Sequence, residues 1–154
     1  MHSKLGHEKE PALNGREAAV HGEYAPALDQ HAFQLIARIK RNHAEGFALP
    51  AGFDHASLAE IHRREPTWRL EMILHCRLAD HVHAARAAGS ILVSHEPQYC
   101  VMSDVQEMHD AGIAVLCTLL SVEHGRELLE MGVDFFEADD VRLSRDTLRQ
   151  MGRR

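Results

Sequence analysis

Short apolar runs alternate with amphipathic stretches along the chain after residue 45. The runs predict five strands, at residues 47–53, 69–74, 90–94, 113–119 and 133–138. Several, such as VLCTLL, are apolar at almost every position, which favours a parallel sheet covered by helices over a one-sided sheet. The stretches between them repeat apolar residues mostly every three or four positions, as amphipathic helices do. The pattern therefore predicts an α/β protein built from βα units.

Local signals mark where these helices end and begin. Gly89, Gly112 and Gly132 each follow a helical stretch and precede a strand, where a left-handed residue is expected after a helix. The expected N-cap residues are Asp54, Ser103, Ser121 and Ser144. The expected apolar helix positions are Leu58 and Ile61; Leu78, Val82 and Ala85; Val101, Val105 and Met108; Val122, Leu128 and Leu129; and Leu143 and Leu148.

Residues 28–154 are expected to form one domain, which begins with a helix over residues 28–41. Residues 1–27 carry few apolar side chains and several Pro and Gly residues, so a tail or one marginal strand is expected there. Five or six βα units fit either a doubly wound sheet or part of a (β/α)₈ barrel. A complete barrel takes about 250 residues, and this chain has 154.

Charge and hydropathy narrow the function classes. The chain has 17 Lys and Arg against 23 Asp and Glu, a formal net charge of −6, so it lacks a broad basic surface for nucleic acid. The first residues lack the apolar core of a signal peptide, and no apolar run has the length of about 18 residues that a membrane helix needs. A cytoplasmic protein without a membrane span is expected.

Cysteine and histidine are the remaining residues with distinctive chemistry. Cys76, Cys100 and Cys117 are too widely spaced for a CxxC motif and odd in number, so reduced and mostly buried thiols are expected. The 13 His raise the question of a metal site. His81 and His83 are two residues apart and cannot share a helix face, as a helical zinc pair would.

Two segments contain short motifs that are only moderately specific alone. Their order and spacing together are more specific. Residues 52–74 contain GFD, a helical stretch, EPTWRL and a strand; residues 93–140 contain VSHEP, a helix ending in Gly112, AVLCTLL and GVDFFEADD. This order is similar to the last part of the glycerophosphodiester phosphodiesterases, over about residues 46–150. The matching positions are Phe53, Asp54, Leu58, Pro66, Gly112, Thr118, Leu128, Leu129, Gly132, Val133, Asp134 and Asp139.

The resemblance implies a partial TIM (β/α)₈-type barrel with about five to six of eight βα units. It also implies hydrolysis of a glycerophosphodiester to glycerol phosphate and an alcohol, with a divalent metal such as Mg²⁺ or Ca²⁺, at the C-terminal mouth of the barrel. In the family, HRG, E-x-D, HD and E-x-K motifs of the first strands supply most catalytic groups. This sequence lacks most of them.

Three short sequences look like fragments of these motifs. His62-Arg63 lacks the rest of the HRG motif and lies in a predicted helix, and His109-Asp110 ends another helix. Glu8-Lys9 in GHEKEP is one residue short of E-x-K, so its side chains would point to opposite faces of a strand. By resemblance, Glu8 is a candidate metal ligand and Lys9 a candidate catalytic residue.

Strand ends supply the candidate substrate-binding residues. His95 and Glu96 follow the predicted strand SILVS, where a barrel places functional loops, and an ordinary exposed loop before Pro97 is the alternative interpretation. Asp139 ends the last strand, where the family keeps an Asp, whereas Asp140 is expected to face solvent. Glu137 is expected to be a strand-end carboxylate rather than a ligand.

The family pattern is altered at several positions near the expected pocket. Cys117 replaces the aromatic residue of a WTvN motif, Leu120 replaces its Asn, and Gly52 replaces the Ser of SFD. Two functions therefore remain open: a phosphodiesterase-like protein that is impaired as this chain alone, and a non-catalytic module. Because a partial barrel leaves open strand edges, such a module would self-associate or pair with a complementary barrel half. A doubly wound binding domain is disfavoured, because no Gly-rich phosphate loop occurs.

Overall fold

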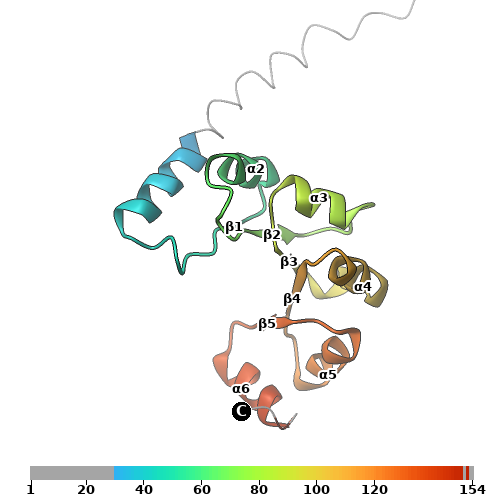
Figure 1. The fold of residues 1–154 in the computed structure, drawn as a ribbon. Helices are drawn as coiled ribbons and strands as arrows, with labels where there is room; N and C mark the ends of the chain where they lie inside the picture. The colour runs from blue at the N-terminus through green and yellow to red at the C-terminus, as the bar shows by residue number, and fades with distance from the viewer. Residues whose placement is uncertain (1–29, 151, 153–154) are drawn as a thin grey trace, which may run out of the picture.

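The chain forms one five-stranded parallel sheet with helices between the strands (Figure 1), in a computed structural model that describes residues 30–150 and 152. The strands are β1 (Ala51–Gly52), β2 (Glu71–Leu74), β3 (Leu92–His95), β4 (Ala114–Thr118) and β5 (Phe135–Glu137). The helices are α2 (His55–Arg64), α3 (His81–Ala87), α4 (Met102–Asp110), α5 (Val122–Met131) and α6 (Val141–Gln150), with a 3₁₀ turn η1 (Pro97–Tyr99). Residues 30–41 form a further helix before β1.

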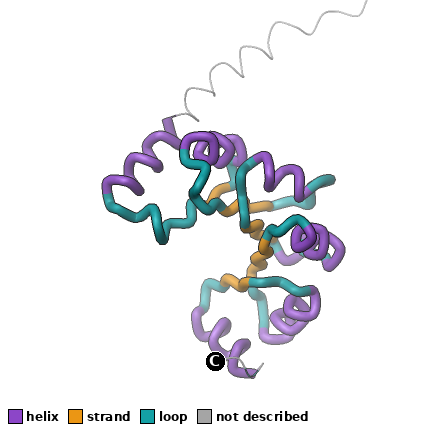
Figure 2. The backbone as a smooth tube through the Cα atoms, viewed as in Figure 1, coloured by secondary structure: helices purple, strands orange, loops and turns teal. Residues whose placement is uncertain are grey.

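The strand order decides between the two predicted architectures. Along the sheet the order is β1-β2-β3-β4-β5, so every strand pairs with its neighbours in sequence. A doubly wound sheet reverses direction at a switch point, whereas a barrel winds in one direction only. The tube in Figure 2 follows the same course, with the strands along the inside of an arc of helices. The fold is therefore a barrel-type α/β fold with five βα units.

The strands are shorter than predicted, and β1 differs most. Residues 47–53 were expected to be extended, but only Ala51 and Gly52 pair with β2. Phe47 is 77% exposed and lies in a turn. Its backbone N–H donates to the Ala44 carbonyl at 3.2 Å. Among the described residues β1 pairs only with β2, so no second strand holds residues 47–49 in a ladder.

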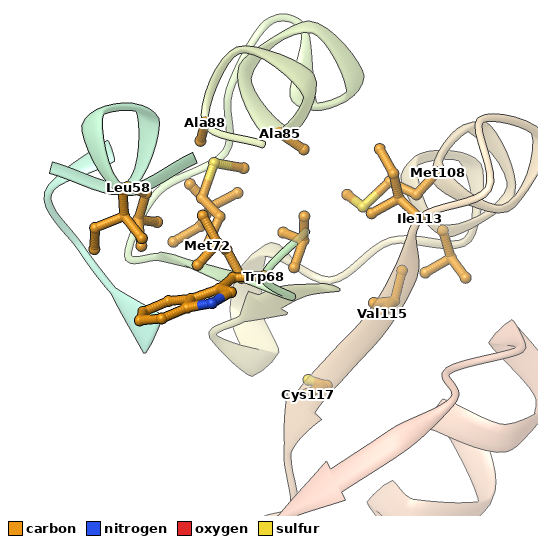
Figure 3. Close-up of a cluster of buried hydrophobic side chains, with 14 of the residues drawn as sticks. Leu58, Trp68, Met72, Ala85, Ala88, Met108, Ile113, Val115 and Cys117 are labelled. Carbon is orange, nitrogen blue, oxygen red and sulfur yellow. The ribbon is translucent and has the colours of Figure 1, made fainter. Parts of the chain in front are cut away.

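Alternation along the strands creates two faces with different environments. The first, named here the helix-covered face, carries the most deeply buried side chains of the sheet. Its members are Met72, Leu74, Val93, His95, Val115, Cys117 and Phe136. Figure 3 shows Met72, Val115 and Cys117 among core side chains that include Met108 and Ala85 of the helices. Removal of this apolar surface from water holds the helices on the sheet.

The opposite face, named here the inner face, is less well covered than the sequence predicted. It carries Ala51, Glu71, Ile73, Leu92, Ser94, Ala114, Leu116, Thr118, Phe135 and Glu137. Leu92 and Ser94 at its centre are buried, but Phe135 at its margin is 53% exposed. Strands that were expected to be covered on both faces thus have helices on one face only.

Helix ends agree with the glycine predictions and partly with the N-cap predictions. Gly89, Gly112 and Gly132 all have positive φ, at 68°, 76° and 89°. Asp54 and Ser121 are N-caps, as expected. Ser103 and Ser144 are not, because α4 begins at Met102 and α6 at Val141. The cap of α6 is instead a carboxylate described below.

One predicted apolar helix face is wrong. Leu143 and Leu148 of α6 were expected to point inward together, but Leu148 is 39% exposed and Thr147 is fully buried. Residues four apart share a helix face, whereas residues five apart do not. Thr147 therefore takes the inward position, and its hydroxyl finds no hydrogen-bond partner among the described residues.

Gly89 has a second constraint besides its backbone conformation. A Cβ atom at this position would lie 2.1 Å from Cγ of His62, the α2 residue that packs over it. At Gly112, which has a similar φ, a Cβ atom would meet nothing within 4 Å. A substitution at Gly112 therefore introduces backbone strain alone, whereas one at Gly89 introduces backbone strain and steric overlap with His62.

We expect Gly89→Ala to lower the free energy of unfolding by about 3 kcal/mol. Gly112→Ala, the matched control, should cost about 1 kcal/mol because it adds only left-handed strain. Urea unfolding followed by circular dichroism measures both values. Equal losses for the two variants would show that the contact between α2 and Gly89 contributes nothing.

Candidate functional site

All five strands end at the same edge of the sheet, because they are parallel. The residues that follow them form what is named here the carboxyl-end rim: Phe53 after β1, His75 after β2, Glu96 after β3, and Asp139 two residues after β5. The carboxyl ends of strands are where barrel proteins assemble functional groups. The rim is therefore the place to look for chemistry in this chain.

Three rim residues from consecutive strands are in direct contact. The rings of Phe53 and His75 stack with centroids 4.3 Å apart and planes 12° from parallel. His75 Nδ1 lies 2.8 Å from Oε1 of Glu96. A carboxylate at this distance accepts a hydrogen bond from the ring and fixes the orientation of the imidazole. Of these three, the sequence analysis proposed only Glu96 as a functional residue, and the structure places it on the rim.

His95 lies beneath the rim. It is the last residue of β3 rather than part of a loop, and its side chain is 2% exposed on the helix-covered face. Its ring lies 5.4 Å from that of His81, and neither of its nitrogens has a hydrogen-bond partner within the part of the chain that the structure describes. Burial, and secondly the neighbouring His81, lower the pKa of His95 to about 4. The structure does not bring His95 and Glu96 together, so substrate contact by His95 stays a prediction.

Beside these two histidines, the buried carboxylate of Asp104 forms an ion pair with the exposed side chain of Arg77. Arg77, just after β2, donates from Nε to Asp104 Oδ2 at 2.9 Å and from Nη2 to Oδ1 at 2.8 Å. Ser103 Oγ donates to Oδ1 at 3.1 Å. The guanidinium hydrogen bonds hold the pKa of Asp104 below its usual range, against the opposing effect of burial. This carboxylate is saturated with donors and fixes the start of α4 against the β2 end.

The other end of the rim is acidic. Thr118, Glu137, Ala138 and Asp139 line a hollow of about 230 Å³, in which Thr118 Oγ1 donates to Glu137 Oε1 at 3.1 Å. Burial, and then the charge of Glu137, raise the pKa of Glu71 on the inner face. Asp139 is thus at the strand end where the sequence analysis put it, and Glu137 is an exposed strand-end carboxylate.

Asp140 has a local structural role that the sequence analysis missed. Its Oδ1 accepts from the backbone N–H of Arg142 at 2.9 Å and from Arg142 Nε at 3.2 Å. Asp140 therefore caps α6, although it was expected only to face solvent. Of the two adjacent carboxylates, Asp139 thus belongs to the rim and Asp140 to the start of α6.

The two short sequences that were expected to lie in helices, His62-Arg63 and His109-Asp110, lie away from the rim. Since the helices run antiparallel to the strands, the ends of α2 and α4 lie at the amino-terminal edge of the sheet. His109 Nε2 lies 2.9 Å from Oδ2 of Asp134, which also accepts from the backbone N–H of Val115 at 2.8 Å. His62 packs over Gly89. Neither can act at the rim.

The described residues do not fit the divalent metal that the resemblance implies. Within residues 30–150 and 152, no group of three or more His, Cys, Asp or Glu is arranged to hold a metal ion. Glu8 and Lys9, the candidate ligand and catalytic residue, lie outside the described residues, as does the boundary expected between residues 27 and 28.

A second hollow in the described part is apolar. It has a volume of about 360 Å³ and lies between the helix at residues 30–41, β1 and α2, with Ala32, Leu35, Leu58 and Ile61 in its lining. Of the rim residues it touches Phe53, and the neighbouring Asp54 in its lining is occupied in capping α2. Its lining is suited to packing rather than to acid–base chemistry.

No family model and no curated protein matches the sequence. Solved structures do match, with the same barrel-type fold. A protein assigned as a glycerophosphoryl diester phosphodiesterase from Silicibacter pomeroyi matches with a TM-score of 0.75 and 23% identity, over 89% of this chain and 49% of the other. A glycerophosphodiester phosphodiesterase from Parabacteroides distasonis matches with a TM-score of 0.71 and 16% sequence identity, over 83% of this chain and 54% of the other.

A phosphodiesterase from Oleispira antarctica, solved with the product sn-glycerol-3-phosphate, gives a TM-score of 0.68 and 12% identity, over 79% of this chain and 50% of the other. The resemblance inferred from sequence is thus confirmed at the level of the fold. The chain spans about half the length of these structures. None of the helices in the described part has the length and apolar character to cross a bilayer.

The buried position of His95 predicts an effect on stability. Because its folded pKa is about 4, below the ordinary 6.5, the unfolded chain binds the proton first as pH falls. Stability should fall between these values by up to about 1.4 kcal/mol per pH unit. His95→Leu should abolish this contribution and be neutral or stabilising at pH 7, because it removes two unsatisfied buried nitrogens.

Urea unfolding at several pH values between 4 and 7 measures the effect. His83→Leu, which removes an exposed histidine from α3, is the control and should keep the pH slope of the parent. Two results would contradict the lowered pKa of buried His95. One is a decrease of more than about 2 kcal/mol in the free energy of unfolding of His95→Leu at pH 7, and the other is an unchanged dependence of its stability on pH.

Proposed function

We propose that this chain provides one half of a glycerophosphodiester phosphodiesterase-like site, and that its carboxyl-end rim contacts the substrate. The observation that carries the proposal is the match in fold to phosphodiesterases, with a TM-score of 0.75 for the first of them. A second support is the position of Glu96 and Asp139 at the carboxyl ends of β3 and β5. Glycerophosphodiesters are proposed as substrates, with glycerol phosphate and an alcohol as products.

Hydrolysis needs groups that the described residues do not supply. Neutralising a phosphodiester takes a cation. The described rim carries the carboxylates of Glu96 and Asp139, and Arg77, which follows β2, is already paired with Asp104. We therefore propose that the chain alone is inactive or nearly so, and that a complementary barrel half completes the site. A cytoplasmic, lipid-metabolic role belongs to the same proposal.

A chimera tests this proposal directly. Residues 46–154 would replace the corresponding half of the Silicibacter pomeroyi protein, and release of glycerol phosphate from glycerophosphocholine would be measured with Mg²⁺ and with Ca²⁺. The chimera should be active, and Glu96→Gln and Asp139→Asn should each lower kcat/KM on the order of tenfold. The chain alone should not exceed a mock preparation.

Matched controls keep the test specific. Glu130→Gln changes an α5 carboxylate away from the strand ends and should leave kcat/KM unchanged. Activity of the chain alone well above the mock level would refute the proposed impairment. If the chimera is folded and active but its kcat/KM is unchanged by both Glu96→Gln and Asp139→Asn, the proposed role of the rim is refuted.

A non-catalytic interaction module is the second candidate, favoured by the open sides of the sheet. Strands β1 and β5 each have one partner, and Phe135 of β5 is 53% exposed on the inner face. Unpaired strand edges beside exposed apolar side chains promote association. In this reading the chain pairs with another copy or with a complementary half.

If the module self-associates, light scattering across a concentration series should give a mass above 17.3 kDa. Phe135→Glu should shift the protein toward the monomer, because it places a charge on the inner face. Val141→Glu, at an exposed position that begins α6, is the control and should have no effect. A folded monomer at every concentration would argue against this function.

A further inference from the structure

The carboxyl-end rim holds one histidine whose ring is fixed on two sides. Phe53 covers one face of the His75 ring, with centroids 4.3 Å apart and planes 12° from parallel. Glu96 Oε1 lies 2.8 Å from Nδ1 at the edge of the same ring. A face contact and an edge contact together restrict rotation about both side-chain torsions. His75 is nevertheless open to solvent, because 61% of its side chain is exposed.

The register of the sheet brings these three residues together. The ladder of β2 and β3 pairs Leu74 with His95. The residues that follow them, His75 and Glu96, are therefore the next pair across the ladder. Strand alternation turns these two side chains, and that of Phe53 after β1, toward the inner face. The three residues thus continue the inner face onto the rim, where a barrel opens to its ligands.

The contact with Glu96 determines which nitrogen of His75 can bind a ligand. An ionised carboxylate only accepts hydrogen bonds, so the proton of a neutral imidazole must lie on Nδ1. Nε2 then carries a lone pair and acts as an acceptor. No side chain or backbone group in the described part of the chain hydrogen-bonds to this Nε2. The rim therefore presents an acceptor nitrogen in a fixed orientation.

A purely structural role does not account for this arrangement. The side chains of His75 and Glu96 are 61% and 35% exposed, and a pair open to solvent contributes little to stability. The neighbouring pair of Arg77 and Asp104 differs, because its carboxylate is buried and saturated with donors. That pair fixes the start of α4, whereas the pair of His75 and Glu96 leaves a polar atom available at the rim.

We propose that Phe53, His75 and Glu96 form a hydroxyl-binding site, in which His75 Nε2 accepts a hydrogen bond from a glycerol hydroxyl of the ligand. A hydroxyl can donate this bond, whereas an ionised phosphate oxygen is an acceptor and opposes the Nε2 lone pair. His75 is thus the residue that contacts the ligand, and Glu96 is a positioning residue that acts through it. The choice of glycerol as the hydroxyl-bearing group rests on the function proposed above.

Nuclear magnetic resonance of the full chain, with isotope-labelled histidine, tests the site without catalysis. At a pH at which histidine side chains are neutral, His75 should carry its proton on Nδ1 and none on Nε2. Glycerol and sn-glycerol-3-phosphate should each shift the His75 Nε2 resonance, and inorganic phosphate should not. His83, an exposed histidine of α3, is the control and should not respond. His75→Phe identifies the signal, since it removes both nitrogens and keeps a ring against Phe53.

Glu96→Gln tests the positioning role. An amide can accept a hydrogen bond from Nδ1 or donate one to it, so both tautomers of His75 should be populated and the response to glycerol should weaken. An unchanged tautomer in this variant would overturn the positioning role. In the parent chain, a proton on Nε2, no response to either glycerol compound, or an equal response to inorganic phosphate would overturn the hydroxyl site.

The chimera separates this inference from the proposed function. His75→Phe should lower kcat/KM about tenfold more for glycerophosphocholine than for propylphosphocholine, which lacks the glycerol hydroxyls. Adding Glu96→Gln to His75→Phe should cause no further loss, because Glu96 acts through the ring. Equal losses on both substrates would overturn the hydroxyl contact. An inactive chimera, with the response of His75 to glycerol intact in the chain, would refute the proposed function and leave the hydroxyl site standing.

Discussion

The burial of alternate strand residues under the helices is the constraint on which the rest of this fold depends. Met72, Val93 and Val115 are partners in neighbouring strands, and each is fully buried. In a parallel ladder, a shift of one residue would turn all of these side chains to the other face. The register that buries them also fixes which residues stand at the strand ends. The positions of the rim residues therefore follow from packing in the core.

The same constraint explains the polar character of the inner face. Once one set of residues is committed to the helices, Glu71, Thr118 and Glu137 must share the opposite side. In a closed barrel such residues line an interior that is shielded from water by strands on all sides. Here the five strands leave that side partly open, which accounts for the mixture of buried and exposed groups on it.

The sequence predicted the parts of this structure that depend on local signals. Gly89, Gly112 and Gly132 had the expected left-handed conformation, and four of the five strands differ from the observed ones by at most two residues at either end. The stack of Phe53 on His75 was missed, because it joins residues that follow different strands and leaves no periodic signal. His95 was assigned to a loop, yet β3 extends to include it, and strand alternation then turns its side chain inward.

The order of strands along the sheet also bears on how the chain folds. Every strand pairs only with the strands before and after it in sequence, so each βα unit needs only its immediate neighbours to complete its hydrogen bonds. Folding can then proceed by stepwise addition of units, as in repeat proteins, without first closing a long loop. In such an assembly the outermost units, with one neighbour each, are the first to fray and the last to form.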